Sequence, residues 1–321
     1  MKFSPSVYEH AAKLIDRSPW EVSRNSELLF QAHAEAFRRY RHSPVVVGID
    51  IYSLEPEAYG ASITRPADNN LPAIQALICA SADDICRLKE FDPSVDGRLP
   101  MVIETGKKLA AAIPEADVKI PVSGPFSIAS NLMGVERLLM ETFLNPDAVK
   151  EALDFIVAGQ LRFCREILAS DLDIAFFESS ATPPLISPRM FQDVELPALK
   201  SMLEETERMI GHPMACIIGG DTAPVLDFIL ETGSKYVICP SETNQPTFMQ
   251  KMENHPEVVV RINMDPGILV SGNLRQIHQE VDRVMSLAAG RENVCIGTGV
   301  LPYETDPNIV DEIKKYIQTN S

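Results

Sequence analysis

The sequence lacks the signals of several large protein classes. Its six cysteines include no Cys-x-x-Cys pair, which argues against a disulfide framework and for a reducing compartment. No apolar run approaches the roughly 20 residues that span a bilayer, and the first residues lack the apolar core of a secretory leader. We therefore expect a cytoplasmic protein without a membrane partner.

Basic charge is also scarce. Lys and Arg number 29 against 45 Asp and Glu, so the formal net charge is −16. Binding to a phosphate backbone needs a basic face, and we therefore expect no nucleic-acid partner. The chain also lacks both the Gly-x-Gly-x-x-Gly fingerprint and a P-loop, so nothing in it indicates a nucleotide site.

What the chain does contain is a regular alternation of strand and helix patterns. Short Val- and Ile-rich runs, apolar on both faces, are typical of parallel strands covered by helices. They lie at 45–49, 118–122, 173–177, 214–218, 235–239, 258–263 and 294–298, and helical periodicity marks 26–40, 145–168, 188–209, 273–289 and 307–318. This alternation predicts one α/β domain over 1–321, a (β/α)8 TIM-type barrel with N-terminal helices over 1–43. A doubly wound open sheet is the alternative.

Carboxylates gather directly after the apolar runs, where a barrel places its chemistry. Asp50, Glu178 and Asp221 are the predicted catalytic residues, because crowded carboxyls raise one another's pKa and can act as general acids. Asp221 could instead cap the helix that follows it. The predicted substrate contacts at the same ends are Tyr52, Phe177 and Asn263, and the first two could flank an aromatic ring.

Three segments resemble the uroporphyrinogen decarboxylase superfamily. They are Glu178-Ser179-Ser180 with 185–191, Met264-Asp265-Pro266 with 267–272, and Gly297-Thr298-Gly299 with 302–309. The resemblance implies a barrel. It also implies one of two chemistries, either decarboxylation of the acetate arms of uroporphyrinogen or methyl transfer to or from a corrinoid protein, usually with zinc.

Features near the N-terminus separate these chemistries. Asp50 stands where the decarboxylase carries an essential aspartate, but the Arg-rich loop that should precede it is missing, so an eight-carboxylate substrate fits poorly. Segments 10–13, 19–23 and 48–60 resemble the branch found in corrinoid-dependent O-demethylases. The resemblance therefore implies a methyltransferase that moves a methyl group from a methoxylated aromatic to the Co(I) corrinoid of a partner protein.

Several alternatives stay open at this stage. They are the decarboxylase, a corrinoid methyltransferase acting on a thiol, an amine or tetrahydrofolate, and an inactive barrel that serves as a binding subunit. A homodimer is also possible. The thiol methyltransferases of the superfamily bind zinc through His-x-Cys on one strand and Cys on the last. Here the corresponding residues are Cys216-Ile217-Ile218 and Thr298, which disfavours a thiolate held by zinc.

A second zinc pattern, Glu-x14-Glu-x20-His, is known in O-demethylases and matches Glu242, Glu257 and His278. Glu257 precedes a predicted strand and His278 lies inside a predicted outer helix. A six-residue strand is about 20 Å long, whereas a zinc–oxygen bond is about 2 Å. If zinc is bound, the predicted ligands are therefore Glu242, Cys216 and Cys239.

Overall fold

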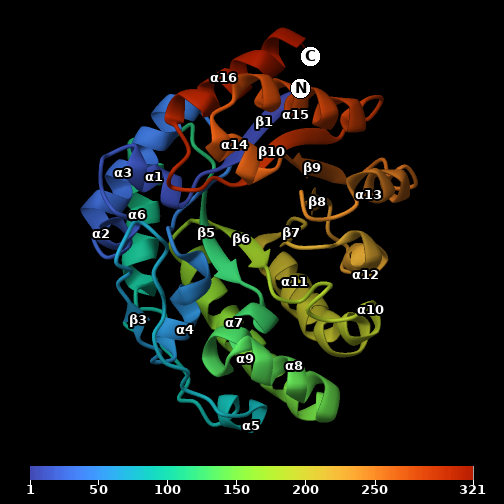
Figure 1. The fold of residues 1–321 in the computed structure, drawn as a ribbon. Coiled ribbons are helices and arrows are strands. Elements are labelled where there is room, and N and C mark those ends of the chain that lie inside the picture. The colour runs from blue at the N-terminus through green and yellow to red at the C-terminus, as the bar shows by residue number, and fades with distance from the viewer. Residues whose placement is uncertain (321) are drawn as a thin grey trace.

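The structure is a computed structural model that describes residues 1–320. Eight strands form one sheet in the order β1-β10-β9-β8-β7-β6-β5-β2, and every neighbouring pair is parallel. A doubly wound sheet reverses its strand order at a switch point. This order follows the chain without reversal and the sheet curls on itself (Figure 1), so the TIM-type barrel is confirmed. The strands are β1 (Lys2–Ser6), β2 (Val45–Val46), β5 (Val118–Ser123), β6 (Asp173–Glu178), β7 (Ala215–Ile218), β8 (Tyr236–Cys239), β9 (Val259–Asn263) and β10 (Val294–Val300).

The two ends of this strand order come together at one seam. No ladder joins β1 to β2 within residues 1–320, but the Ser4 hydroxyl donates a hydrogen bond of 2.9 Å to the carbonyl of Ser43, just before β2. All seven predicted runs contain strands of the sheet, and the eighth strand is the one that the sequence did not indicate.

That eighth strand is β1, in a region predicted to be helical. Pro5 lies in the middle of it, and proline is normally a signal against a strand because it has no N–H to donate. Here β1 pairs only with β10, and the register shifts between Ser4 and Ser6. Pro5 therefore interrupts no hydrogen bond. The prediction of helices over 1–43 is wrong for residues 2–6, and helices α1, α2 and α3 fill much of the rest.

The helices form a shell outside the curled sheet (Figure 1). Asn25 caps α3 by accepting hydrogen bonds from two backbone N–H groups, which explains why this helix begins where the sequence predicts. The helices are α1 (Glu9–Lys13), α2 (Pro19–Ser23), α3 (Ser26–Tyr40), α4 (Leu54–Ala58), α5 (Ala82–Ile85), α6 (Leu99–Ala112), α7 (Pro125–Met133), α8 (Val135–Leu144), α9 (Pro146–Leu168), α10 (Pro188–Met190), α11 (Leu196–Ile210), α12 (Leu226–Leu230), α13 (Gln245–Met252), α14 (Pro266–Ser271), α15 (Leu274–Ala288) and α16 (Pro307–Asn320). Short 3-10 turns lie at Ile51–Ser53 (η1) and Ala223–Val225 (η3), and a π-helical turn at Phe191–Glu195 (η2) joins α10 to α11.

Two apolar layers hold the barrel together. The larger one packs between the strands and the helices, and a smaller one fills the inside of the barrel. Successive side chains of a strand point to opposite faces, so Phe177, Ile217 and Ile238 face inward while Cys216 and Cys239 face the helices.

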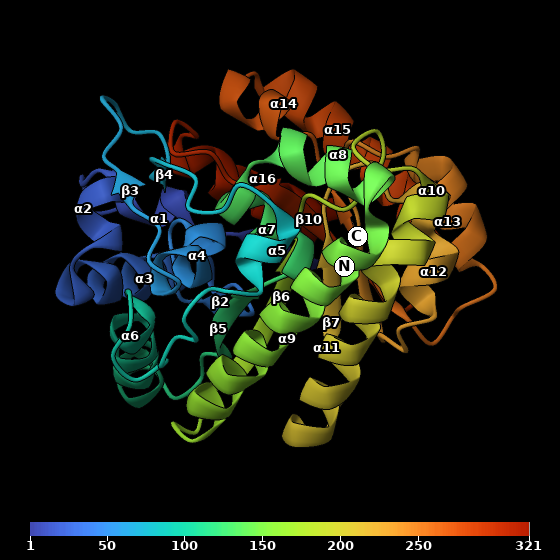
Figure 2. The same ribbon diagram turned by 90° about the horizontal axis from the view of Figure 1, so that it is seen from below.

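A small hairpin of β3 (Ile63–Thr64) and β4 (Ala73–Ile74) lies at the same end of the molecule as α14 (Figure 2). Residues next to and within β4 contribute to a cavity at the C-terminal ends of the strands. Among residues 1–320, none of the helices has the length and apolar character needed to cross a membrane.

Candidate active site

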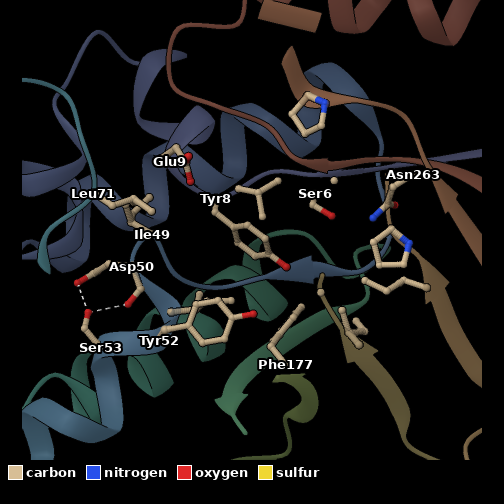
Figure 3. A pocket seen from close by; sticks show the side chains of 18 of the residues that line it. Ser6, Tyr8, Glu9, Ile49, Asp50, Tyr52, Ser53, Leu71, Phe177 and Asn263 are labelled. Atoms are coloured by element: carbon tan, nitrogen blue, oxygen red, sulfur yellow. Dashed lines mark hydrogen bonds between the residues drawn. The ribbon is translucent and has the colours of Figure 1, made fainter. Parts of the chain in front are cut away.

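A cavity of about 380 Å³ lies at the C-terminal ends of the strands, where TIM-type barrels carry their active sites. Its volume is within the usual range for small-molecule sites. Side chains from β1, β6, β8, β9 and the segment after β2 surround it (Figure 3). The polar and aromatic side chains that line it, and that bear on its chemistry, include Ser6, Tyr8, Glu9, Asp50, Tyr52, Ser53, Asn131, Phe177, Glu242, Arg261 and Asn263.

Aromatic rings form much of the wall. Tyr8 and Phe177 meet edge to face, with ring centroids 5.9 Å apart and planes at 89°. Tyr52 projects into the same space (Figure 3), and the amide of Asn131 donates a 2.9 Å hydrogen bond to its backbone carbonyl. The three predicted substrate contacts, Tyr52, Phe177 and Asn263, all line the cavity. Their contact with a substrate stays a prediction.

Asp50 is held by a buried arginine. Both terminal nitrogens of Arg98 donate to the two carboxylate oxygens, at 2.6 and 2.7 Å, and the Ser53 hydroxyl donates at 2.5 Å. Arg98 also donates to the Glu57 carboxylate at 2.5 Å and to the Ser23 carbonyl at 3.1 Å. A fork-to-fork pair of this kind fixes geometry and neutralises charge. Asp50 therefore stands at the cavity wall as half of an ion pair.

Glu178 lies behind the wall and is fully buried. Its carboxylate accepts hydrogen bonds from the Ser127 hydroxyl and from the backbone N–H groups of Ser127, Ser179 and Ser180. Burial raises the pKa of Glu178, and these four hydrogen bonds act in the opposite direction. A Cβ on Gly124 would lie 2.1 Å from its Oε2, so the close approach of α7 to this carboxylate requires glycine. Glu178 does not line the cavity.

A second buried acid, Glu195, accompanies Glu178. It ends the π-helical turn η2, and neither carboxyl oxygen has a hydrogen-bond partner. Burial, reinforced by the charge of Glu178, raises the pKa of Glu195 well above its ordinary value. We infer that Glu195 stays protonated and that this pair belongs to the core.

Asp221 and Glu242 lie nearer the surface, at the ends of β7 and β8. Asp221 accepts a 2.6 Å hydrogen bond from the Thr243 hydroxyl, whose oxygen in turn accepts from the backbone N–H of Ala223 at 2.8 Å. The N-cap residue of η3 is Thr222, the first N–H of the turn is satisfied by the Thr243 hydroxyl, and Asp221 accepts no hydrogen bond from this turn within residues 1–320, so the alternative that Asp221 caps it is wrong. Glu242 is exposed at the cavity rim, where the Ser241 hydroxyl donates to it at 3.1 Å.

The predicted zinc ligands do not come together. Cys216 and Cys239 are buried on the helix-facing side of the sheet, and burial raises the pKa of both thiols, which disfavours thiolates. Glu242 faces the cavity from the other side. Within residues 1–320, no group of three or more His, Cys, Asp or Glu side chains has the geometry to hold a metal ion. The donor set of the described residues does not fit zinc.

The spacing pattern Glu-x14-Glu-x20-His is also dispersed. Glu257 is exposed just before β9, at the N-terminal end of the barrel, 3.8 Å from the Lys235 ammonium. His278 lies on α15, where it pairs with Glu312 at 3.1 Å and stacks on Tyr316 with ring centroids 3.9 Å apart. Neither side chain lines the cavity with Glu242.

Sequence reasoning missed three ionisable residues of the cavity, Tyr8, Glu9 and Arg261. Glu9 follows β1, the strand that was missed, so no signal placed it at a strand end. Its Oε2 is buried without a partner, and burial raises its pKa to about 7. Arg261 lies inside the run Val258-Val259-Val260-Arg261-Ile262. An arginine inside an otherwise apolar strand could have been recognised from the sequence as a candidate functional residue, because buried charges without a partner are rare.

A curled parallel sheet with its cavity at the carboxyl ends of the strands defines a TIM-type barrel with the site geometry of an enzyme. Residues 5–318 match the uroporphyrinogen decarboxylase (URO-D) family, and the chain belongs to this family. The family recognised from the sequence is therefore confirmed.

Relatives with curated names are methyltransferases. The methylcobamide:CoM methyltransferase MtaA of Methanosarcina barkeri is 22% identical over 255 residues, which cover 79% of this chain and 73% of that protein. A methylated-thiol–coenzyme M methyltransferase of Methanosarcina mazei is 26% identical over 191 residues, covering 56% of this chain and 48% of the relative.

A solved structure shares the whole fold. A methyltransferase from Methanosarcina mazei superposes with a TM-score of 0.82 over 99% of this chain and 92% of that one, at 19% sequence identity. At this identity the similarity establishes the fold alone.

Proposed function

We propose that this protein is a corrinoid-dependent methyltransferase that takes a methyl group from a methoxylated aromatic and passes it to the Co(I) corrinoid of a partner protein. The observation that carries the proposal is the cavity of about 380 Å³ walled by Tyr8, Tyr52 and Phe177. Aromatic walls of this kind pack against a flat ring. The name of one curated relative supports a corrinoid as one of the two methyl carriers, although in that relative the methylcobamide is named as donor and coenzyme M as acceptor.

The transfer breaks one bond and forms another. Cobalt(I) supplies the electron pair that bonds the methyl carbon, the C–O bond breaks, and its electron pair stays on the aryl oxygen. A phenolate is a poor leaving group because the pKa of its conjugate acid is roughly 10. The enzyme therefore helps most by giving this oxygen a proton or a hydrogen bond.

Glu9 is the best-placed acid for this task. It lines the cavity, its Oε2 has no hydrogen-bond partner in the part of the chain that the structure describes, and its pKa of about 7 keeps much of it protonated at neutral pH. Asp50 is neutralised by Arg98, and Glu178 lies behind the wall. Tyr8 and Tyr52 can each donate a hydrogen bond to the same oxygen. The roles predicted for Asp50 and Glu178 thus become positioning roles in this proposal.

Two observations weigh against the alternatives. Of the described residues that line the cavity, Arg261 is the one basic side chain, which is too little positive charge for a substrate with eight carboxylates. Thiol methyltransferases of the superfamily hold their thiolate on a zinc ligand set, whereas the corresponding positions here, Cys216, Ile218 and Thr298, carry only one metal-binding side chain. A thiol acceptor such as coenzyme M remains the second candidate, because both curated relatives are named for it.

A spectroscopic assay tests the proposal. The protein is mixed with a Co(I) corrinoid protein and a panel of methoxylated aromatics, methylamines and methylated thiols, and the methyl-Co(III) spectrum is followed. We expect methylation with aryl ethers. Methylation with methylated thiols alone, or with no donor in the panel, would contradict it.

The variant Glu9→Gln sharpens the assay. With a pKa of about 7, the acid is lost as pH rises, so the rate of the wild type should fall above pH 7. We expect Glu9→Gln to lower the rate by about 10²-fold or more and to remove this pH dependence. An unchanged pH profile would remove Glu9 from the mechanism.

A further inference from the structure

One arginine inside the barrel has no hydrogen-bond or ion-pair partner among residues 1–320. Arg261, on β9, is only 6% exposed, and its Nε is buried without a hydrogen-bond acceptor. Within residues 1–320 no carboxylate forms an ion pair with it. A buried cation without a counter-ion costs several kcal/mol of desolvation. A site that retains such a charge points to an anion that comes from outside the chain.

The guanidinium stem is directed toward the cavity. Arg261 pairs in register with Cys295, and Asn263 pairs with Gly297, one inward-facing layer closer to the mouth. A Cβ on Gly297 would lie 2.8 Å from both Cγ and Cδ of Arg261. The stem therefore rises past Gly297, in space that any other residue would occupy, and Arg261 lines the cavity at the strand ends.

The acidic side chains of the cavity do not neutralise the positive charge of Arg261, so this charge can bind an anionic ligand. Asp50 is paired with Arg98, and Glu242 is exposed at the rim. Glu9 carries a pKa of about 7 because of its burial and forms no ion pair with Arg261 within residues 1–320. None of the three is positioned to neutralise the guanidinium.

The nearest polar neighbours are neutral. Burial raises the pKa of Tyr8 and of Tyr236, both of which lie close enough to Arg261 for its charge to oppose the shift, so both phenols stay protonated. Asn263 is buried beside it, its Oδ1 has no hydrogen-bond partner within residues 1–320, and its Nδ2 amide group can donate a hydrogen bond to an anion. A guanidinium among neutral hydrogen-bonding groups can bind a carboxylate through two parallel hydrogen bonds.

We propose that Arg261, with Asn263 beside it, binds a carboxylate substituent of the methyl donor, so that the substrate is a methoxylated aromatic acid. The inference rests on the proposed function and narrows it. The aromatic wall of Tyr8, Tyr52 and Phe177 would hold the ring, the carboxylate would point down to Arg261, and the ether would face the mouth, where a partner protein can approach.

Calorimetric binding of two matched ligands tests the site without any corrinoid. At pH 7.5, 4-methoxybenzoate carries the charge and 4-methoxybenzamide has the same shape without it. We expect the wild type to bind the benzoate at least tenfold more tightly. Arg261→Met should remove this difference by weakening the benzoate only, and Arg261→Lys should keep part of it because it retains the charge but loses the fork.

Two further variants complete the design. Gly297→Ala should weaken benzoate binding although Arg261 remains, because the new Cβ displaces its stem. Arg189→Met is the matched control, since this arginine is on α10 with its side chain 89% exposed, and it should change nothing.

The inference is overturned if the wild type does not bind the benzoate, if it binds both ligands equally, or if Arg261→Met leaves benzoate binding intact. Benzoate binding that depends on Arg261, without methylation of the corrinoid, would support the anion site and contradict only the proposed reaction. Methylation from neutral ethers without benzoate binding would do the reverse.

Discussion

Two buried arginines lie near the same cavity, one behind the Asp50 segment and the other inside the barrel on β9. Arg98, next to the Asp50 segment, is 7% exposed and donates to Asp50 and Glu57. Arg261, on β9, is 6% exposed and has neither a hydrogen bond nor an ion pair within residues 1–320. The two arginines are thus buried to nearly the same extent, but only Arg98 forms ion pairs with described residues. From this difference we infer that Arg98 stabilises the wall of the cavity, whereas Arg261 binds a ligand.

Removing the paired arginine should have the largest effect on stability. Arg98→Met leaves Asp50 buried without its cation, and loss of one partner of a buried pair costs about 3–5 kcal/mol. We expect the free energy of unfolding in urea to fall by that amount. The double variant Arg98→Met/Asp50→Asn should recover part of the loss. A single variant as stable as the wild type would show that the pair contributes nothing.

The next largest effect is expected from Glu55, a buried carboxyl group, and it appears in the pH dependence of the free energy of unfolding. Glu55 is fully buried, accepts hydrogen bonds from Ser123, and has a pKa raised by burial to about 7. The unfolded chain loses this proton near pH 4.5, so the native state binds more protons between pH 4.5 and 7. Stability from this group is therefore present below pH 4.5 and is lost as pH rises to about 7.

Glu55→Gln should flatten that dependence. We expect the wild type to lose on the order of 2–3 kcal/mol more than the variant between pH 4.5 and 7, measured by urea unfolding at several pH values. Identical slopes for the two proteins would place the titration elsewhere.

Removing the unpaired arginine should act in the opposite direction to removing Arg98. Because no described carboxylate (residues 1–320) pairs with Arg261, Arg261→Met should leave the free energy of unfolding unchanged or raise it by about 1 kcal/mol. The comparison is made by urea unfolding without ligand. A loss of several kcal/mol would mean that Arg261, like Arg98, is part of the framework.

The smallest effect is expected far from the mouth. His278 and Glu312 form a half-exposed pair on the outer helices, and such pairs contribute about 0–1 kcal/mol. His278→Ala should therefore change stability by less than about 1 kcal/mol and leave the metal content of the purified protein unchanged. A loss of bound metal in this variant would support Glu242, Glu257 and His278 as a set of metal ligands.

Much of the fold could be predicted from local patterns. The apolar runs 118–122 and 173–177 became β5 and β6, and Ser26–Tyr40 became α3 with its capping Asn25. The strand β1 could not be predicted, because its proline is tolerated only where one side of the strand forms no ladder, and that depends on the seam where the two edges of the curled sheet meet.

The candidate site was less accessible to sequence reasoning. The pleat places Phe177 in the cavity and Cys216 behind the sheet, although both lie in apolar runs. The sequence could not tell which face of each strand turns inward, because both faces are buried. Glu9 was missed along with its strand.

By itself the sequence determined where strands and helices lie and which family the chain belongs to, since these follow from periodicity, capping residues and motifs close together in the chain. Only the tertiary structure decided which charges are satisfied. Arg98 meets Asp50 from 48 positions away in the sequence, whereas no acid reaches Arg261 within residues 1–320. Ion pairs depend on side chains that come together only when the sheet curls into a barrel. The presence of such a pair distinguishes the structural Arg98 from Arg261, which we propose to bind a ligand.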